Sequence, residues 1–315
     1  MDDSAEFTLS ILAGRPDTEF LGKTISHLVR ACRFRFASRI LVVDTLPPGR
    51  PQPPEILAEQ NRRLLVECEK LRSSGVIDEI FELGSDPDFS REAARKHFGK
   101  PLREQRDYRG IPMLGWVYGM EKAKTDYFLH FDSDMLLHQS ADYDWISEGR
   151  RLMEAAEEIM FVAPLPGPPT SDGALVQRTA NYSVDPRGFY AFKTFSSRRF
   201  LVDRRRLQSI LPITPAPIPW NVSWKRRLRD LVTGKGALSQ WETMMSARLQ
   251  ASPFVRAHLR SAKAWTLHPT DHGERFLRAL PDIIRRIELG EYPPAQAGKY
   301  DLVPDAWTQP TLTSP

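Results

Sequence analysis

Gly115–Met135, GWVYGMEKAKTDYFLHFDSDM, is the stretch of sequence that decides the fold. Its apolar residues first recur at helical spacing, over Ile111–Ala123, and then form a run in Asp126–Phe131 that predicts a strand. Asp132 and Asp134 follow that run directly. Ligands of open α/β sheets bind beyond the carboxyl ends of the strands. The two aspartates are therefore predicted to lie at a ligand-binding edge of the sheet.

The D-x-D pattern occurs twice more, at Asp86-Pro-Asp88 and at Asp142-Tyr-Asp144. Neither copy follows a strand-like run. The first lies in a polar stretch and the second precedes a predicted helix over Trp145–Met160, for which Asp144 is a candidate N-cap. Aspartate is common at turns and helix caps, so we interpret both outer copies in that way.

The chain before this stretch alternates short apolar runs with amphipathic segments. A β-α-β-α-β order of this kind predicts a parallel sheet covered by helices. The polar segment Gly84–Arg109 is predicted to be a long surface connection. The strands are expected at Phe7–Ala13, Arg39–Asp44 and Ile77–Leu83, and the helices at Thr18–Cys32 and Glu55–Ser73.

The second half contains shorter elements and many prolines. Strands are predicted at Phe161–Ala163, Tyr190–Phe195, Phe200–Asp203 and Trp265–Leu267, and helices at Leu238–Gln250 and Glu274–Leu289. The second and third of these strands are candidates for an antiparallel pair. We expect one domain over residues 1–305, with a nucleotide-binding half at 7–135, an acceptor-binding half at 136–305 and a loose tail at 306–315.

Composition excludes several classes of protein. The 315 residues include 44 Lys and Arg against 40 Asp and Glu, a net charge of +4 that is too small to indicate nucleic-acid binding. Cys32 and Cys68 lie in predicted helices, which favours reduced, partly buried thiols over a disulfide or zinc site. No apolar run reaches the ~18 residues that a membrane span needs, and the first residues lack a basic, apolar leader. We therefore expect a cytoplasmic protein.

Several side chains have the chemistry to handle a diphosphate leaving group. A divalent cation held by one or two carboxylates and the substrate phosphates neutralises such a group, and Asp132 and Asp134 are candidates to hold it. Asp44 ends a predicted strand at the same edge, where it could accept from a base or ribose or act as a turn residue. Glu242 follows Trp241, and an apolar neighbour raises a carboxyl pKa toward that of a general base.

Five stretches together resemble the GT-A fold glycosyltransferases, in particular the large family 2-like group. They are FTLSILAGRPDTEFLGKTISHLVRAC (Phe7–Cys32), ILVVD (Ile40–Asp44), the opening stretch, WETMMSARL (Trp241–Leu249) and LHPTDH (Leu267–His272). The chain departs from that group where Thr45-Leu46-Pro47 replaces an acidic, Gly/Ser-rich turn and where Trp116-Val117 replaces an Arg-Asn pair. The resemblance is therefore to a divergent member.

The resemblance implies a GT-A type α/β fold, with a mostly parallel nucleotide-binding sheet flanked by helices and a smaller, mixed acceptor-binding part. It implies a metal-dependent hexosyl- or related transferase that uses a UDP-, GDP- or TDP-linked sugar. Glu242 takes the position of the catalytic base, with an inverting outcome. Mn²⁺ or Mg²⁺ is expected on Asp132, Asp134 and His268, with His272 as a further ligand. The donor nucleotide is expected at Ala13, Gly14, Arg15, Asp44, Gly115, Asp132 and Ser133, and the acceptor or lid at Trp241, Trp220 and Trp224.

Residues 220–232 form a basic amphipathic segment. Trp220, Trp224, Leu228 and Leu231 share one helical face, with Lys225, Arg226, Arg227 and Arg229 around them. Such a segment can lie on an anionic membrane, close over a diphosphate as a flap, or be a solvated face. We favour the flap, because Pro212–Pro219 and Gly234-Lys-Gly236 are candidate hinges.

Three other functions remain open. A retaining GT-A enzyme shares the D-x-D pattern and needs no base at Glu242. A catalytically inactive protein could bind sugar nucleotides without turnover. A nucleotidyltransferase usually has a Gly-rich, basic loop after the first strand, which Gly14-Arg15-Pro16 matches poorly. The donor sugar, the acceptor and the oligomeric state are left open.

Overall fold

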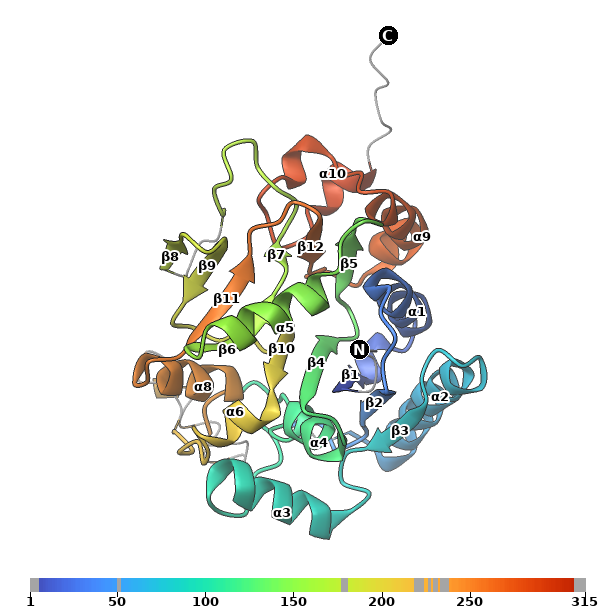
Figure 1. The fold of residues 1–315 in the computed structure, drawn as a ribbon. Helices are drawn as coiled ribbons and strands as arrows, with labels where there is room; N and C mark the ends of the chain where they lie inside the picture. The colour runs from blue at the N-terminus through green and yellow to red at the C-terminus, as the bar shows by residue number, and fades with distance from the viewer. Residues whose placement is uncertain are drawn as a thin grey trace.

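A computed structural model describes residues 6–49, 52–176, 181–217, 224–225, 228, 232 and 238–308. The strands of its main sheet follow the order β3-β2-β1-β4-β10-β6-β11-β9-β8 (Figure 1). A second sheet has the order β5-β12-β7. The main strands are β1 (Phe7–Gly14), β2 (Ser38–Asp44), β3 (Glu79–Glu82), β4 (Tyr127–Asp132), β6 (Ile159–Ala163), β8 (Tyr182–Asp185), β9 (Phe189–Phe192), β10 (Arg199–Asp203) and β11 (Val255–Leu259), and the others are β5 (Leu136–Gln139), β7 (Leu165–Pro166) and β12 (Ala264–Leu267).

The strands of the first half are parallel, as their sequence predicts. β1 pairs in parallel with both β2 and β4, and β2 pairs in parallel with β3. The order then becomes mixed, because β10 runs antiparallel to β4 and β6 while β11 is parallel to β6. The predicted α/β class, with helices flanking a large sheet, is confirmed.

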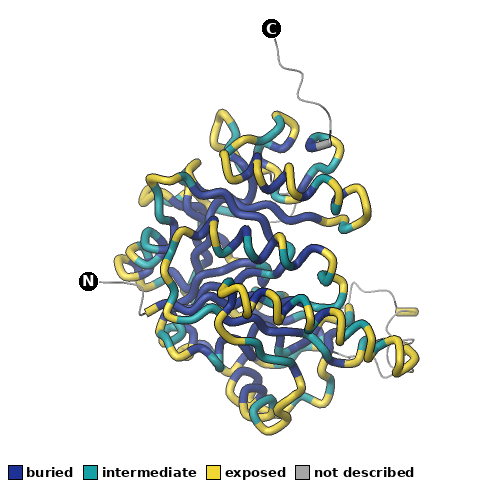
Figure 2. The backbone as a smooth tube through the Cα atoms, turned by 90° about the vertical axis from the view of Figure 1, so that its right-hand side faces the viewer, coloured by how far each residue is buried: buried dark blue, intermediate teal, exposed yellow. Residues whose placement is uncertain are grey.

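Helices cover both faces of the main sheet, and the buried side chains divide accordingly. α1 (Leu21–Cys32), α2 (Pro54–Ser73) and α5 (Trp145–Ala155) pack into one core, while α3 (Pro87–Phe98), α4 (Gly115–Lys122) and α8 (Trp241–Gln250) pack into another. The strands lie in the buried centre and the outer turns of the helices reach solvent (Figure 2). The remaining helical elements are η2 (Arg15–Asp17), α6 (Arg204–Gln208), α9 (Glu274–Glu288), η3 (Pro294–Gln296) and α10 (Pro304–Thr308).

The surface connection predicted for Gly84–Arg109 is wrong in its first part, which contains α3. Asp86 caps this helix by accepting from the Phe89 amide at 3.0 Å, and Gly99 ends it at a φ of 73°. Ala93, Ala94 and Phe98 supply its buried face, which is small enough to escape a search for apolar periodicity. Asp144 likewise caps α5, accepting from the amides of Ile146 and Ser147. The interpretation of the two outer aspartate pairs as capping residues is thus confirmed for Asp86 and Asp144.

Other boundaries also differ from prediction. β5, β7, β8 and β11 were not expected, and the helix expected to reach Met160 ends at Ala155 so that β6 can begin at Ile159. β9 and β10 do not pair, because β6 and β11 lie between them. Residues 306–308 were expected in the tail, but they belong to α10, where Trp307 is buried. Residues 309–315 lie outside the described residues.

Two expectations from composition can be compared with the structure. Cys32 and Cys68 are unpaired and buried. Within the described ranges, the chain has no helix of the length and apolarity that crossing a bilayer requires.

Candidate functional site

A cavity of about 1480 Å³ opens beyond the carboxyl ends of β1, β2 and β4. Because these three strands are parallel neighbours, their ends meet at one edge of the sheet. Eight of the predicted site residues line this cavity, and Gly115, Trp241, His268 and His272 do not. The eight are Ala13, Gly14, Arg15, Asp44, Asp132, Ser133, Asp134 and Glu242.

The turn that carries the aspartates is held by the strands on both sides of β4. The Asp132 amide donates to the Arg198 carbonyl at 2.8 Å, and the Ser133 amide donates to the Leu12 carbonyl at 2.9 Å. The Ser133 hydroxyl donates to Asp17 Oδ2 at 2.8 Å. Three bonds from separate segments therefore fix the direction in which Asp132 and Asp134 point.

Asp132 and Asp134 differ in their surroundings. Asp132 Oδ1 lies 3.3 Å from Trp116 Nε1 and 3.1 Å from His130 Nε2, so that oxygen is already engaged by the protein. Asp134 Oδ2 instead faces two imidazoles, at 3.4 Å from His268 Nε2 and 3.5 Å from His272 Nε2. Asp134 Oδ1 and His272 Nε2 are buried and have no hydrogen-bond partner among the residues that the structure describes.

The chemistry of this group fits a divalent cation. Burial works against ionisation of Asp134, but its contacts with His268 and His272 outweigh burial and hold the Asp134 pKa well below its ordinary value. An ionised carboxylate facing two imidazole nitrogens, with buried polar atoms left unpaired, is a suitable donor set for a cation. In the described part of the chain, no group of three or more His, Cys, Asp or Glu residues is arranged so that it could hold a metal ion. The three side chains would therefore supply only part of a coordination shell.

Asp17 also lines the cavity, although the sequence pattern did not indicate a site residue at this position. In the sequence, Asp17 is simply part of a turn cluster. Its Oδ2 accepts from the Gly14 amide at 2.7 Å and from the Ser133 hydroxyl. Burial raises the pKa of Asp17 to about 6, although both of these hydrogen bonds oppose the shift. Asp17 thereby joins the end of β1 to the Asp132–Asp134 turn.

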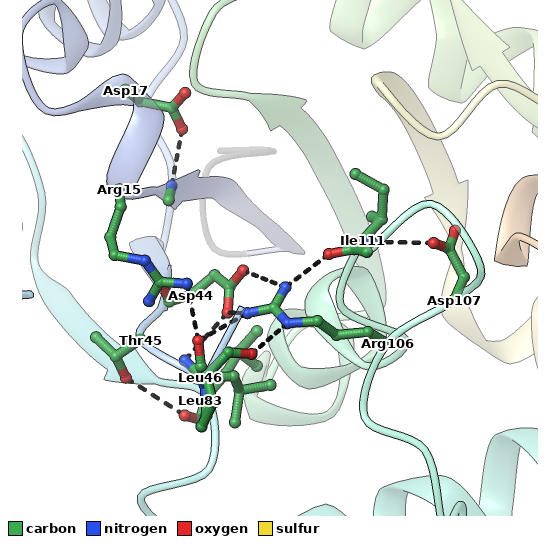
Figure 3. A network of polar contacts seen from close by, with 12 residues as sticks. Arg15, Asp17, Asp44, Thr45, Leu46, Leu83, Arg106, Asp107 and Ile111 are labelled. Atoms are coloured by element: carbon green, nitrogen blue, oxygen red, sulfur yellow. Dashed lines mark hydrogen bonds and ion pairs between the residues drawn. The ribbon is translucent and has the colours of Figure 1, made fainter. Parts of the chain in front are cut away.

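Asp44 is engaged by another residue that the sequence did not point to, Arg106 (Figure 3). The two guanidinium nitrogens Nη1 and Nη2 of Arg106 each lie 2.9 Å from an oxygen of the Asp44 carboxylate. The other N–H groups of Arg106 donate to the carbonyls of Pro47, Gly110 and Leu46, so all five are used. The side chains are only 10% and 13% exposed.

This ion pair changes what Asp44 can do. Oδ1 of Asp44 also accepts from the Leu46 amide at 3.2 Å, which leaves little free capacity for a base or ribose. The pair fastens the segment Leu102–Pro112, which lines the cavity, to the end of β2. Arg15 strengthens the same junction by donating to the Asp44 and Leu46 carbonyls at 3.3 and 2.8 Å.

Glu242 enters the cavity from the first turn of α8. Its Oε2 accepts from the Ser197 hydroxyl at 3.3 Å. Burial raises the pKa of Glu242, while the positive charges of Arg198 and Arg256 oppose this shift. The carboxylate thus combines access to the cavity with a pKa displaced toward that of a general base.

Three predicted residues lie behind the cavity surface or away from it. Trp241 is 1% exposed and stacks on Trp116, with 5.3 Å between ring centroids, so it supports the wall from behind. Gly115 is buried at the start of α4, where a Cβ would stand 2.8 Å from a methyl group of Leu12. Trp224 is 69% exposed. Trp220, the Gly234–Gly236 hinge and most of the segment 220–232 lie outside the described residues.

Comparison with known proteins adds little information about the function of this chain. No family model matches the sequence, and no curated protein matches it. Among solved structures, the fold is similar to a crystal structure of GalNAc-T7 with UDP, GalNAc and Mn²⁺, at a TM-score of 0.47 and 10% identity, over 84% of this chain and 43% of that one. The chain therefore spans less than half the length of that protein.

Two structures of LgtC are also similar. One is an active-site mutant, at a TM-score of 0.35 and 11% identity, and the other is described as a galactosyltransferase with donor and acceptor sugar analogs, at 0.35 and 13%. Each covers 80% of this chain and 72% of the other. With TM-scores below 0.5, these likenesses establish neither a family nor an activity for this chain.

Proposed function

We propose that this chain is a divalent-metal-dependent glycosyltransferase that moves a sugar from a nucleotide-sugar donor to an acceptor hydroxyl. The observation that carries the proposal is the meeting of two chemistries in one cavity. Asp134, with its two facing imidazoles, lies at the ends of the parallel strands, and Glu242 reaches the same cavity from α8. A sugar-transfer reaction needs a place for each, one at the leaving diphosphate and one at the attacking hydroxyl.

Asp134, His268 and His272 would hold the cation, and Asp132 lines the same cavity. Mg²⁺ and Mn²⁺ commonly take part of their coordination from substrate phosphates, which agrees with an incomplete protein shell. When bound, the cation would neutralise the charge that develops on the departing diphosphate. Arg198 lines the cavity beside these residues and adds a fixed positive charge for the same anion.

Glu242 would remove the proton from the acceptor hydroxyl. The hydroxyl oxygen would then attack the anomeric carbon from the side opposite the diphosphate, and the bond between that carbon and the diphosphate oxygen would break. The product would carry the inverted configuration. A positioned base of this kind contributes ~10²–10⁴-fold to the rate. A retaining reaction would not need Glu242, so the anomeric configuration of the product, read by NMR, separates the two outcomes.

The donor half of the proposal is tested by thermal shift with UDP-, GDP- and TDP-linked sugars, with and without Mn²⁺. A donor present at 100 times its Kd should stabilise the protein by about 2.7 kcal/mol, and only with metal. Asp134→Asn should abolish the metal-dependent shift. Asp142→Asn changes an exposed aspartate of an outer D-x-D pair, which contacts Lys263, and should behave as wild type. A shift that is equal with and without metal would remove the cation from the proposal.

The transfer half is tested on Glu242→Gln. This variant should give the wild-type donor shift but lose turnover by 10²-fold or more, on the order expected for removal of a general base. Full turnover in the variant would exclude Glu242 as the base while leaving the donor site standing.

A further inference from the structure

The C-terminal segment 299–303 lies directly beside His268. The His268 amide donates to the Tyr300 carbonyl at 3.0 Å, and the Leu302 amide donates to the His268 carbonyl at 2.9 Å. These bonds form a parallel bridge between His268 and Asp301. The Tyr300 ring also stacks on the imidazole, with 5.8 Å between centroids. The backbone therefore sets Asp301 opposite His268.

A buried glutamine anchors this segment. Gln296 is 0% exposed and uses its full side-chain capacity. Its Nε2 donates to the carbonyls of Lys299 and Asp301 at 2.9 and 3.1 Å. Its Oε1 accepts from the Val303 amide at 2.9 Å and from Trp307 Nε1 at 2.8 Å. Asp301 is thus held in place through its backbone, although its carboxylate is 63% exposed.

His268 Nδ1 has two neighbours with opposite requirements. Asp301 Oδ1 lies 3.1 Å away and can only accept a hydrogen bond when ionised. Arg198 Nη1 also lies 3.1 Å away and can only donate. A neutral imidazole carries one hydrogen, so Nδ1 can satisfy only one of these neighbours at a time.

The partner of Nδ1 determines whether His268 Nε2 presents a lone pair or a hydrogen to Asp134. With Asp301 as partner, Nδ1 carries the hydrogen and Nε2 turns a lone pair toward the space beside Asp134. With Arg198 as partner, the hydrogen moves to Nε2, which then donates to Asp134 Oδ2 and cannot bind a metal. The ring nitrogen that holds a metal is commonly selected in this way by a carboxylate on the other nitrogen.

We propose that Asp301 is a positioning residue for the metal centre, which holds His268 in the tautomer whose Nε2 is free to bind a divalent cation. The inference rests on the proposed function, since it takes the Asp134 site as the place of the cation. The segment 299–303 would then contribute to the metal site, although it lies far from Asp134 in the sequence.

The first test needs no metal. ¹⁵N NMR of the histidine-labelled, metal-free protein distinguishes the two tautomers, and His268→Gln assigns the signal. Wild type should show the hydrogen of His268 on Nδ1. In Asp301→Ala it should move to Nε2, because Arg198 is then the neighbour that remains. Asp301→Asn keeps an acceptor oxygen and should restore part of the wild-type signal.

The second test measures Mn²⁺ binding by electron paramagnetic resonance, with UDP present. Asp301→Ala should bind Mn²⁺ 10–100-fold more weakly, the usual effect of losing such a partner. Asp305→Ala is the matched control, because Asp305 is a nearby exposed aspartate in α10 that pairs with Arg275, and this variant should bind Mn²⁺ as wild type does.

The two tests separate the inference from the proposal beneath it. Wild-type protein that fails to bind Mn²⁺ would overturn the proposed metal function. Wild-type binding that is matched by Asp301→Ala, with an unchanged tautomer, would overturn the role of Asp301 alone.

Discussion

Arg106→Met should destabilise the protein far more than removal of an ordinary surface arginine. Methionine keeps much of the length and the apolar stem but removes every donor. The Asp44 carboxylate, whose side chain is 13% exposed, would lose both hydrogen bonds from the Arg106 guanidinium. The carbonyls of Pro47, Gly110 and Leu46 would lose a donor at the same time.

The size of the effect follows from burial. Breaking a buried ion pair by removing one partner costs about 3–5 kcal/mol, because the other charge stays buried without compensation. The slight exposure of both side chains places Arg106→Met near the lower end, at about 3 kcal/mol. Each kcal/mol lowers Tm by roughly 2–4 °C in a large domain, so the expected loss is about 6–12 °C.

Arg62→Met provides the comparison. Arg62 makes a bidentate pair with Glu59, but these side chains are 65% and 54% exposed, so its loss should leave Tm close to that of the wild type. Scanning calorimetry on both variants measures the difference. A double-mutant cycle with Asp44→Asn should give a coupling of about 1–3 kcal/mol. Equal Tm losses for the two arginine variants, or additive effects in the cycle, would refute the view that Asp44 and Arg106 act as one buried junction.

Three further predictions concern stability. Gly119→Ala places a Cβ against Ser10 Oγ, closer than van der Waals contact, and should cost about 1–3 kcal/mol in urea unfolding. Gly22→Ala, with nothing within 4 Å of the new Cβ, should be neutral or stabilising. Burial lowers the pKa of His27, although Glu288 opposes this shift. At acidic pH the unfolded chain therefore binds a proton that the folded chain does not bind, so the free energy of unfolding should fall as pH drops below ~6.5. The fall should be less steep in His27→Gln. The Asp17 pKa of about 6 has the opposite effect, with stability lost as pH rises from about 4 through 6, and urea midpoints of Asp17→Asn should lack that decline.

The sequence predicted the parallel half of the fold because its signals are local. The first two predicted strands, Phe7–Ala13 and Arg39–Asp44, are mainly apolar runs, and each is followed by an amphipathic stretch that predicts a helix. Asp144 could be separated from Asp132 and Asp134 for the same reason, since a capping aspartate is recognised by the helix predicted after it and a strand-end aspartate by the strand before it. Asp86 was set apart only because no strand-like run precedes it, and the helix that it caps was missed.

The rest of the site could not be predicted because its partners are remote in sequence. No sequence pattern near Asp44 indicates that Arg106, 62 residues later, will bind its carboxylate. The contact of Asp17 with Ser133 spans 116 residues. The sequence identified Asp44 as a carboxylate at the correct edge of the sheet but did not indicate Asp17, and what either carboxylate binds depends on packing between loops.

His268 shows how a small sheet brings residues that are distant in sequence close together in space. β5 begins directly after the Asp132–Asp134 turn, and β12 ends directly before His268. The two strands pair antiparallel with Leu267 opposite Leu136, so His268 falls opposite Met135, next to Asp134. Side chains alternate between the faces of a strand, and a slip of one residue in this pairing would turn His268 to the other face. Leu136 and Leu267 are both completely buried, and their pairing places the imidazole of His268 beside Asp134.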